Sequence, residues 1–174
     1  MKNILEWAKE IIIAIIIAAI ILTFIKPIVV KQSSMEPTFY NGDYIFISKQ
    51  SYTLFGDVKR GDVVVFHTDM LDENNKDKNL IKRVIGLPGD TVEIVDGYVY
   101  LNGEQLDEPY VAEQGLSGDM EEIVVPEGQL FAMGDNRRVS QDSRDPAVGC
   151  VNEEEILGKV VLRIFPFNEF KVFS

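Results

Sequence analysis

Two residues of this sequence, Ser34 and Lys82, could together carry out nucleophilic chemistry. Ser34 stands where an apolar run over residues 28–30 leads into a turn at Pro37, a fixed and exposed position of the kind that a nucleophile needs. A serine hydroxyl is a weak nucleophile and requires a base. Lys82 lies within the apolar segment LIKRVI, where loss of hydration lowers the pKa of an amine. A neutral amine there could take the serine proton.

Each of these residues also has an ordinary structural interpretation. A serine near a turn is commonly a capping or turn residue, and a strand lysine commonly points to water beside an acid. The only histidine, His67, is the other candidate base, but it follows VVVF at a predicted strand end, with Asp62 or Asp69 as its neighbours. Cys150 is the only cysteine and lies in a Gly-Cys-Val run typical of a buried, inert thiol.

A third polar segment follows the apolar run LFAM at residues 130–133. Residues 134–144 read GDNRRVSQDSR and are rich in hydroxyl, carboxylate and guanidinium groups. Such a loop could supply a hydroxyl that orients a buried amine, and Asp/Arg pairs that brace the site. Taken alone, the same composition is also typical of a solvated turn.

The elements that would position these residues are mostly short strands. Asp96-Gly97 and Asn102-Gly103 predict two-residue hairpin turns, because these residue types tolerate positive φ. Polar, turn-rich composition predicts exposed loops over residues 68–79 and 112–121. Apolar or alternating runs predict strands over residues 44–47, 63–66, 80–85, 91–95, 98–101, 122–125, 130–133 and 160–165. The fold is therefore expected to be mainly β.

The segment over residues 28–34 is expected to run as a strand towards Ser34. With the two-residue period of a strand, residues 28, 30, 32 and 34 would share one face. Ile28 and Val30 would then line a small apolar surface beside the serine.

An apolar segment near the N-terminus has the length of a membrane span. Residues 11–25 contain no charge, and a helix starting at Ile4 would measure about 33 Å, close to the thickness of the hydrocarbon core. No Ala-x-Ala cleavage site follows it, which argues against a removed signal peptide, and it has no polar face for an interfacial helix. It is also too rich in isoleucine to be covered as a core helix. We therefore expect one transmembrane anchor in residues 1–27 and an extracytoplasmic β-rich domain in residues 28–174.

Composition limits the partners. The formal net charge of −11 opposes nucleic-acid backbones, and no basic stripe is present to bind them. The sequence has no C-x-x-C motif and no His/Cys cluster, so no metal or other cofactor is expected.

Read together and in order, the polar segments resemble a known enzyme family. SMEPTF at 34–39, GDVVVF at 61–66, KRVIGLPGD at 82–90 and GDNRRVSQDSR at 134–144 are similar to the motif boxes of the type I signal peptidase (leader peptidase) family. With the preceding anchor, the resemblance covers most of the chain, and the short form is similar to the Gram-positive type. It implies an antiparallel catalytic domain of coiled β-sheets.

The resemblance also implies roles for individual residues. Ser34 would be the nucleophile and Lys82 the general base, with Ser140 hydrogen-bonded to the lysine. Two bracing ion pairs would join Asp142 to Arg144 and Arg83 to Asp135.

The oxyanion hole departs from the pattern of some members. Those members carry a serine two residues before the nucleophile, where this chain has Gln32. The backbone N–H of Ser34 would be one oxyanion donor, and the Gln32 amide could be the second.

The reaction implied is removal of N-terminal signal peptides from exported pre-proteins through an acyl-enzyme, with cleavage after small residues of the Ala-x-Ala type. Shallow pockets lined by Ile28, Val30, Phe39 and Ile81 would take those small side chains. The partners would be signal-peptide-bearing secretory pre-proteins and the lipid bilayer.

The implied location is the plasma membrane, crossed once, with the N-terminus cytoplasmic and the catalytic domain outside. This orientation comes from the resemblance, because the lysines that flank the apolar segment nearly balance: Lys2 and Lys9 before it, Lys26 and Lys31 after it.

Two other functions remain open. A self-cleaving Ser/Lys regulator of the LexA type would share the dyad but would need a DNA-binding segment and an internal cleavage loop. A membrane-anchored, inactive binding module would be expected to lack Ser34 or Lys82. The sequence does not indicate which pre-proteins are preferred, whether sister enzymes share the work, or what the oligomeric state is.

Overall fold

Short β-branched and aromatic runs pair into two antiparallel sheets in this computed structural model, which describes residues 4–48, 52, 56–71, 75 and 77–173. The larger sheet has the order β1-β2-β11-β3-β4-β9-β10, with β12 paired to β11. Its strands are β1 (Ile25–Val29), β2 (Tyr44–Ser48), β3 (Val63–Leu71), β4 (Asp77–Gly86), β9 (Gln129–Met133), β10 (Val151–Asn152), β11 (Ile156–Phe165) and β12 (Lys171–Val172). Two short 3-10 helices, η1 (Glu153–Glu155) and η2 (Phe167–Glu169), precede β11 and β12.

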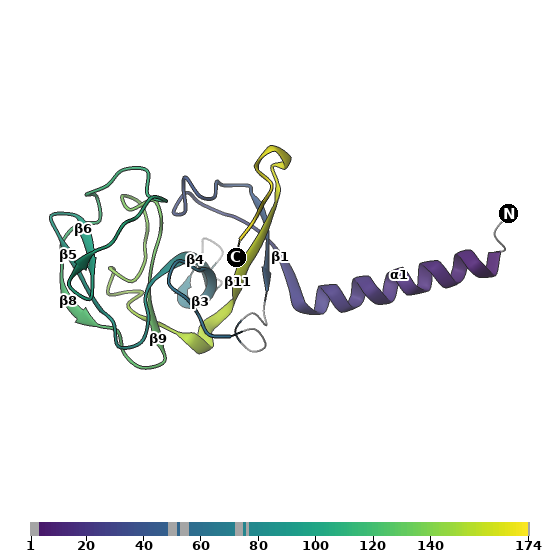
Figure 1. Cartoon of the computed structure of the whole chain (residues 1–174), viewed down its shortest axis with the longest axis horizontal. Helices are drawn as coiled ribbons and strands as arrows, with labels where there is room; N and C mark the ends of the chain where they lie inside the picture. The colour runs from purple at the N-terminus through teal and green to yellow at the C-terminus, as the bar shows by residue number, and fades with distance from the viewer. Residues whose placement is uncertain (1–3, 49–51, 53–55, 72–74, 76, 174) are drawn as a thin grey trace.

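The smaller sheet has the order β7-β6-β5-β8 and lies at the end of the body remote from the N-terminal helix (Figure 1). Its strands are β5 (Thr91–Val95), β6 (Tyr98–Leu101), β7 (Glu104–Gln105) and β8 (Met120–Val124). The turns between β5, β6 and β7 have positive φ at both central residues, at Asp96-Gly97 and at Asn102-Gly103. This geometry matches the twist of the strands that it joins and confirms the predicted hairpin turns.

The mainly β prediction is confirmed. The strands predicted over residues 91–95 and 98–101 have the predicted bounds, and the other predicted strands are present with shifted ends. The predicted loop over residues 68–79 is wrong at both ends. β3 extends to Leu71 and β4 begins at Asp77, with Thr68 paired to Lys78 and His67 to Asn79. Polar residues complete this ladder because backbone hydrogen bonding, rather than burial, sustains the outer part of a hairpin. In the segment expected as a loop over residues 112–121, Met120 already belongs to β8.

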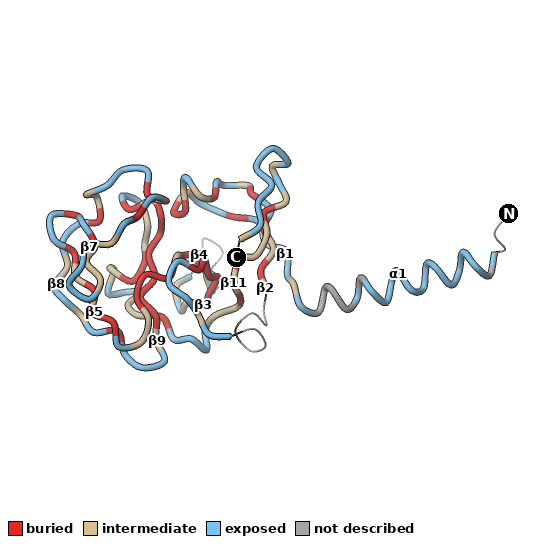
Figure 2. Tube along the Cα trace, viewed as in Figure 1, coloured by how far each residue is buried: buried red, intermediate tan, exposed pale blue. Residues whose placement is uncertain are grey.

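The N-terminal helix, α1 (Ile4–Phe24), projects away from the β body (Figure 1). Its isoleucines at positions 11–13 and 15–17 are exposed (Figure 2). Within the described part of the chain, no helix has the combination of length and apolar character that crossing a membrane requires.

The strand that follows α1 ends earlier than expected. β1 is an edge strand, which tolerates the missing N–H of Pro27, and it stops at Val29. Gln32 then adopts a φ of 72°, and its backbone N–H donates to Asn41 Oδ1 at 3.2 Å. The expectation that residues 28, 30, 32 and 34 share one strand face is therefore wrong.

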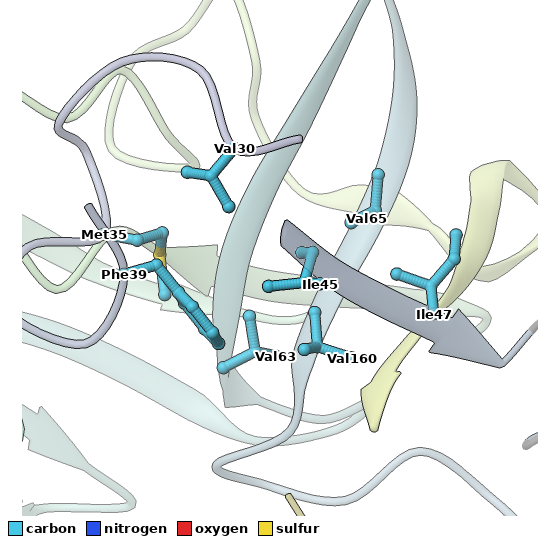
Figure 3. Packing of buried hydrophobic residues seen from close by; sticks show 8 residues of the cluster. All are labelled: Val30, Met35, Phe39, Ile45, Ile47, Val63, Val65 and Val160. Atoms are coloured by element: carbon cyan, nitrogen blue, oxygen red, sulfur yellow. The ribbon is translucent and has the colours of Figure 1, made fainter. Parts of the chain in front are cut away.

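A hydrophobic cluster beneath this segment fixes the turn that carries Ser34. Met35 and Phe39, both fully buried, pack with side chains of β2, β3 and β11 (Figure 3). Each such burial stabilises the fold by about 1.5–3 kcal/mol. The turn is thus held from below by its own apolar side chains, which leaves its polar atoms to form the site above.

Candidate active site

Ser34 and Lys82 meet in a buried polar contact, although 48 residues separate them in the sequence. Lys82 Nζ donates to Ser34 Oγ at 2.8 Å. Lys82 is 1% exposed and Ser34 is 9% exposed. Lys82 is held in the interior of β4, where it pairs with Val64 of β3. The two predicted residues are therefore placed together by the turn after β1 and the middle of the sheet.

Burial lowers the pKa of the Lys82 amine from 10.5 to about 8. The Asp142 carboxylate opposes this shift, while the positive charges of Lys78 and Arg144 add to it. With a pKa near 8, about a tenth of the amines are neutral at pH 7. The neutral Lys82 amine can therefore accept the proton of the Ser34 hydroxyl near neutral pH.

The backbone of the serine turn is clamped by the loop after β9. The N–H of Asn136 donates to the carbonyl of Ser34 at 3.1 Å, and its Nδ2 donates to the carbonyl of Ser33 at 3.1 Å. Asn136 was not singled out from the sequence, where its only signal was membership of the polar segment over residues 134–144.

The two expected ion pairs are both formed. Arg83 donates from Nε and Nη2 to the two oxygens of Asp135, at 2.8 and 2.7 Å. Thr38 Oγ1 donates to the same carboxylate at 2.5 Å, so the serine turn is tied to the loop after β9 a second time. Arg144 donates from Nε and Nη2 to the fully buried Asp142, each at 2.8 Å.

Asp142 is held ionised inside the protein. Burial raises its pKa, but the hydrogen bonds and charge of Arg144 outweigh burial, and the resulting pKa is below the ordinary value. Asp142 Oδ2 also accepts the N–H of Gly134 at 2.9 Å. The pair therefore fixes the beginning of the loop that carries Asn136.

Ser140 lies beside the dyad without the expected bond to Lys82. Its Oγ is buried and forms no hydrogen bond of good geometry with a described residue, but it lies close enough to the Asp142 carboxylate to help lower the pKa of that group. A Cβ added to Gly134 would overlap both Ser140 Oγ and the carbonyl oxygen of Ser34, which places this hydroxyl against the turn that carries Ser34.

A buried charge network next to this loop was missed by the sequence analysis. Arg137 donates to both oxygens of Glu108, at 2.9 and 2.5 Å, and to Ser117 Oγ at 2.9 Å. All three residues are buried. They come from separate parts of the chain, so no local pattern predicts their meeting. The network joins the segment between β7 and β8 to the loop after β9.

The residues proposed for substrate pockets divide into two groups. Ile28 and Ile81 are partly exposed and pack on the cluster beneath the serine turn. Val30 and Phe39 are 3% and 0% exposed, and Phe39 stacks on Phe173 with ring centroids 4.9 Å apart. Both are core residues that support the turn, so the expectation that they line an open pocket is wrong.

The backbone N–H of Ser34 makes no hydrogen bond to any described residue, which leaves it able to bind an oxyanion. Gln32 is exposed, and its backbone N–H is occupied by Asn41. Its side-chain amide is the part of this residue that remains for the proposed second donor.

The remaining reactive side chains lie elsewhere. His67 Nδ1 is 3.4 Å from Asn79 Oδ1, and its Nε2 is 3.9 Å from Asp77, on the β3–β4 hairpin. Cys150 is half-buried rather than fully buried, and burial raises the pKa of its thiol. Among the residues described, no group of three or more His, Cys, Asp or Glu side chains could hold a metal ion.

Comparison with known proteins identifies the family to which this chain is similar. The family profile described as signal peptidase, peptidase S26, matches residues 4–165. Signal peptidase I of Bacillus licheniformis is 38% identical over 98% of this chain and 93% of its own length. Signal peptidase I S of Bacillus subtilis (strain 168) is 40% identical, over 98% of this chain and 94% of the relative. Signal peptidase IB of Staphylococcus aureus (strain COL) is 39% identical, over 98% of this chain and 94% of the relative.

A crystal structure of a signal peptidase I from Enterococcus faecalis V583 is 32% identical to this chain and covers 59% of it, with 96% of that chain aligned and a TM-score of 0.48. The family profile and the near full-length relatives together show that the chain belongs to the signal peptidase family, peptidase S26, and that it is a serine peptidase.

Proposed function

We propose that this enzyme removes signal peptides from exported pre-proteins with Ser34 as the nucleophile and Lys82 as the general base. The observation that carries the proposal is the buried 2.8 Å contact between Lys82 Nζ and Ser34 Oγ. The pKa of Lys82, lowered to about 8 by burial, supports the assignment of a base.

In the acylation step, the neutral amine of Lys82 takes the hydroxyl proton while Ser34 Oγ bonds to the carbonyl carbon of the last residue of the signal peptide. The oxyanion that develops is stabilised by the backbone N–H of Ser34, with the Gln32 side-chain amide proposed as the second donor. The Lys82 ammonium then returns the proton to the leaving amine. The signal peptide remains as an ester on Ser34 until water, deprotonated by the same amine, hydrolyses it.

The loop after β9 supports this chemistry by position. Asn136 fixes the carbonyls of Ser33 and Ser34, so the hydroxyl is presented to Lys82 in one orientation. We assign Asn136, together with the Arg83–Asp135 and Asp142–Arg144 pairs, to positioning. A misplacement of about 1 Å in such a site lowers the rate by about a hundredfold.

The open edge of β4 offers a place for the substrate. β9 pairs with β4 only from Arg83 onward, so the preceding part of β4, which contains Ile81, has no partner on that side among the described strands. A signal peptide added there as an extended strand would lie next to Ser34, with main-chain bonds providing affinity. The partly exposed Ile28 and Ile81 would leave shallow space for small side chains of the Ala-x-Ala type.

We also propose that residues 1–27 anchor the enzyme in the plasma membrane, with the domain over residues 28–174 outside the cell. Support comes from the uncharged residues 11–25 and from the exposed isoleucines of α1. A bilayer anchor would hold the enzyme near the membrane-embedded part of its substrate and raise their effective concentration. The proposed reaction uses no metal or cofactor.

The decisive experiment incubates the purified full-length protein in detergent with an exported precursor and maps the cut by mass spectrometry. Wild type should cut once, after an Ala-x-Ala sequence, whereas Ser34→Ala should bind the precursor and leave it intact. The kcat/KM of wild type should rise with pH through an apparent pKa near 8, because the neutral amine is the active form.

Each alternative function gives a different result in the same assay. Cleavage of the enzyme's own chain with the precursor untouched would support a self-cleaving regulator. Binding of the precursor without turnover by folded wild type would support an inactive binding module. Full activity of Ser34→Ala would remove this serine from the mechanism.

A further inference from the structure

A pocket of about 220 Å³ opens beside the serine turn and shares no lining residue with the β4 edge or with Ile28. Glu36 and Pro37, which follow the nucleophile in the chain, form one wall. Asn136 and Arg137 of the loop after β9 form a second wall, and Val111 and Leu116 contribute apolar surface from the segment between β7 and β8.

The walls of this pocket are built from parts that also hold the nucleophile. Asn136 donates to the Ser34 carbonyl, and Glu36 donates its N–H to the Ser33 carbonyl at 3.2 Å. Arg137 is fixed by its buried pair with Glu108. The pocket therefore has a defined position relative to Ser34 Oγ.

The charge that the pocket presents comes from Glu36. Asp135 is engaged by Arg83 and Thr38, and Arg137 by Glu108 and Ser117. At the rim, Arg138 and Glu113 are both exposed and lie 3.6 Å apart, so they largely cancel each other. The side chain of Glu36 makes no hydrogen bond or ion pair with a described residue. One carboxylate beside an apolar surface favours a side chain with an aliphatic stem and a cationic end.

We propose that this pocket binds the mature side of the substrate, the residues directly after the cut, and that it selects lysine or arginine over glutamate or aspartate there. This inference rests on the proposed function, in which the signal-peptide side occupies the β4 edge beside Ile28 and Ile81. The mature side lies on the other side of the scissile bond, and Glu36 and Pro37, which follow Ser34 directly in the chain, line a pocket that contains no residue of β4. Three extended residues after the cut cover about 10 Å, so the side chain in the pocket belongs to one of the first three mature residues.

The test compares cleavage of peptides that share one signal-peptide segment and differ only after the cut. Lysine, glutamine and glutamate are placed in turn at each of the first three mature positions, and kcat/KM is measured with the full-length enzyme in detergent. At one position, lysine should be cut about threefold to tenfold faster than glutamate, since an exposed charge pair changes an equilibrium by up to about fivefold. The ratio should shrink at high ionic strength.

Substitutions of Glu36 assign the effect to the pocket. Glu36→Gln should reduce the lysine-to-glutamate ratio to below about twofold, and Glu36→Lys should invert it. Glu104→Gln, on exposed β7 and outside the pocket, is the matched control and should retain the wild-type ratio. Thermal unfolding of each variant verifies that the fold is intact.

The outcomes separate this inference from the proposed function. Equal cleavage of all peptides by wild type, or a ratio that Glu36→Lys leaves unchanged, overturns the pocket assignment alone. Failure of folded wild type to cut any peptide overturns the proposed function and the assignment with it.

Discussion

Replacing the buried amine with a methyl thioether should make the protein inactive and, near neutral pH, more stable. Lys82→Met keeps the length and apolar stem of the side chain but removes its charge. In the folded wild type this charge is 1% exposed, and burial lowers its pKa from 10.5 to about 8. The folded state therefore disfavours the protonated amine that the unfolded chain carries.

The magnitude follows from that difference in pKa. At about 1.36 kcal/mol per unit, the buried amine costs roughly 3 kcal/mol of stability at pH 7. Loss of the hydrogen bond to Ser34 subtracts about 1 kcal/mol from the gain. The net gain for Lys82→Met is thus about 2 kcal/mol, a rise in Tm of about 4–8 °C for a chain of this size.

The gain should disappear at high pH. Because the folded pKa is lower than the unfolded one, the unfolded chain binds the extra proton between about pH 8 and pH 10.5, and wild-type stability rises with pH through that window. At pH 10 the free energies of unfolding of the two proteins should differ by less than about 1 kcal/mol.

The assay is thermal unfolding of the full-length proteins in detergent at pH 7 and pH 10. Lys59→Met, exposed and outside the set of charges that shift the pKa of Lys82, is the control and should differ little from wild type in its free energy of unfolding at both pH values. A Lys82→Met protein that is less stable than wild type at pH 7, or whose advantage is equal at both pH values, would refute the lowering of the Lys82 pKa by burial.

Four further substitutions test the arrangement around the dyad. In precursor cleavage, Lys82→Arg should be nearly as inactive as Lys82→Ala, because a guanidinium remains protonated; substantial activity would make the lysine a structural charge. Ser140→Ala should leave unfolding within about 0.5 kcal/mol, since its hydroxyl forms no hydrogen bond of good geometry, yet reduce kcat about tenfold if that hydroxyl orients the amine. An unchanged kcat would end this role. Gly134→Ala should destabilise the fold by about 1–3 kcal/mol and reduce kcat about a hundredfold, because its Cβ would displace the Ser34 carbonyl; wild-type kinetics would argue against that close approach. His67→Ala should retain most activity, and a loss of about a hundredfold in folded protein would bring histidine into the mechanism.

The strands of the small sheet could be predicted from the sequence because their signals are local. Alternating apolar residues over 91–95 and 98–101 meet turns whose Asp-Gly and Asn-Gly pairs suit positive φ. The end of β1 depends instead on a distant residue. Gln32 leaves the strand conformation where its N–H donates to the Asn41 side chain, and no pattern in residues 28–34 predicts that partner.

The residues of the candidate site could be predicted from the sequence, but several of their hydrogen-bond and ion-pair partners could not. The pairs between Arg83 and Asp135 and between Asp142 and Arg144 were expected from the resemblance, and both are formed. Asn136 contacts the serine turn, and Glu108 with Arg137 joins the segment between β7 and β8 to the loop after β9. These partners are distant in the sequence and are brought together only by three-dimensional packing. A two-residue strand period placed Val30 beside the substrate and the resemblance placed Phe39 there, whereas both side chains are buried in the core.

The long-range contacts of the serine turn affect the order in which the enzyme folds during synthesis. The segment that carries Ser34 is tied to Lys82 across 48 residues, to Asn136 across 103, and, through the Thr38 carbonyl, to Arg163 across 125. Contacts of such high sequence separation form late and slowly, because the intervening chain must be closed into a loop first. During synthesis, the serine turn is made early and then waits for β11, almost at the end of the chain. With Ser34 and Lys82 in the proposed roles, we expect the nascent chain to gain activity only after β11 has been made and has folded against the serine turn.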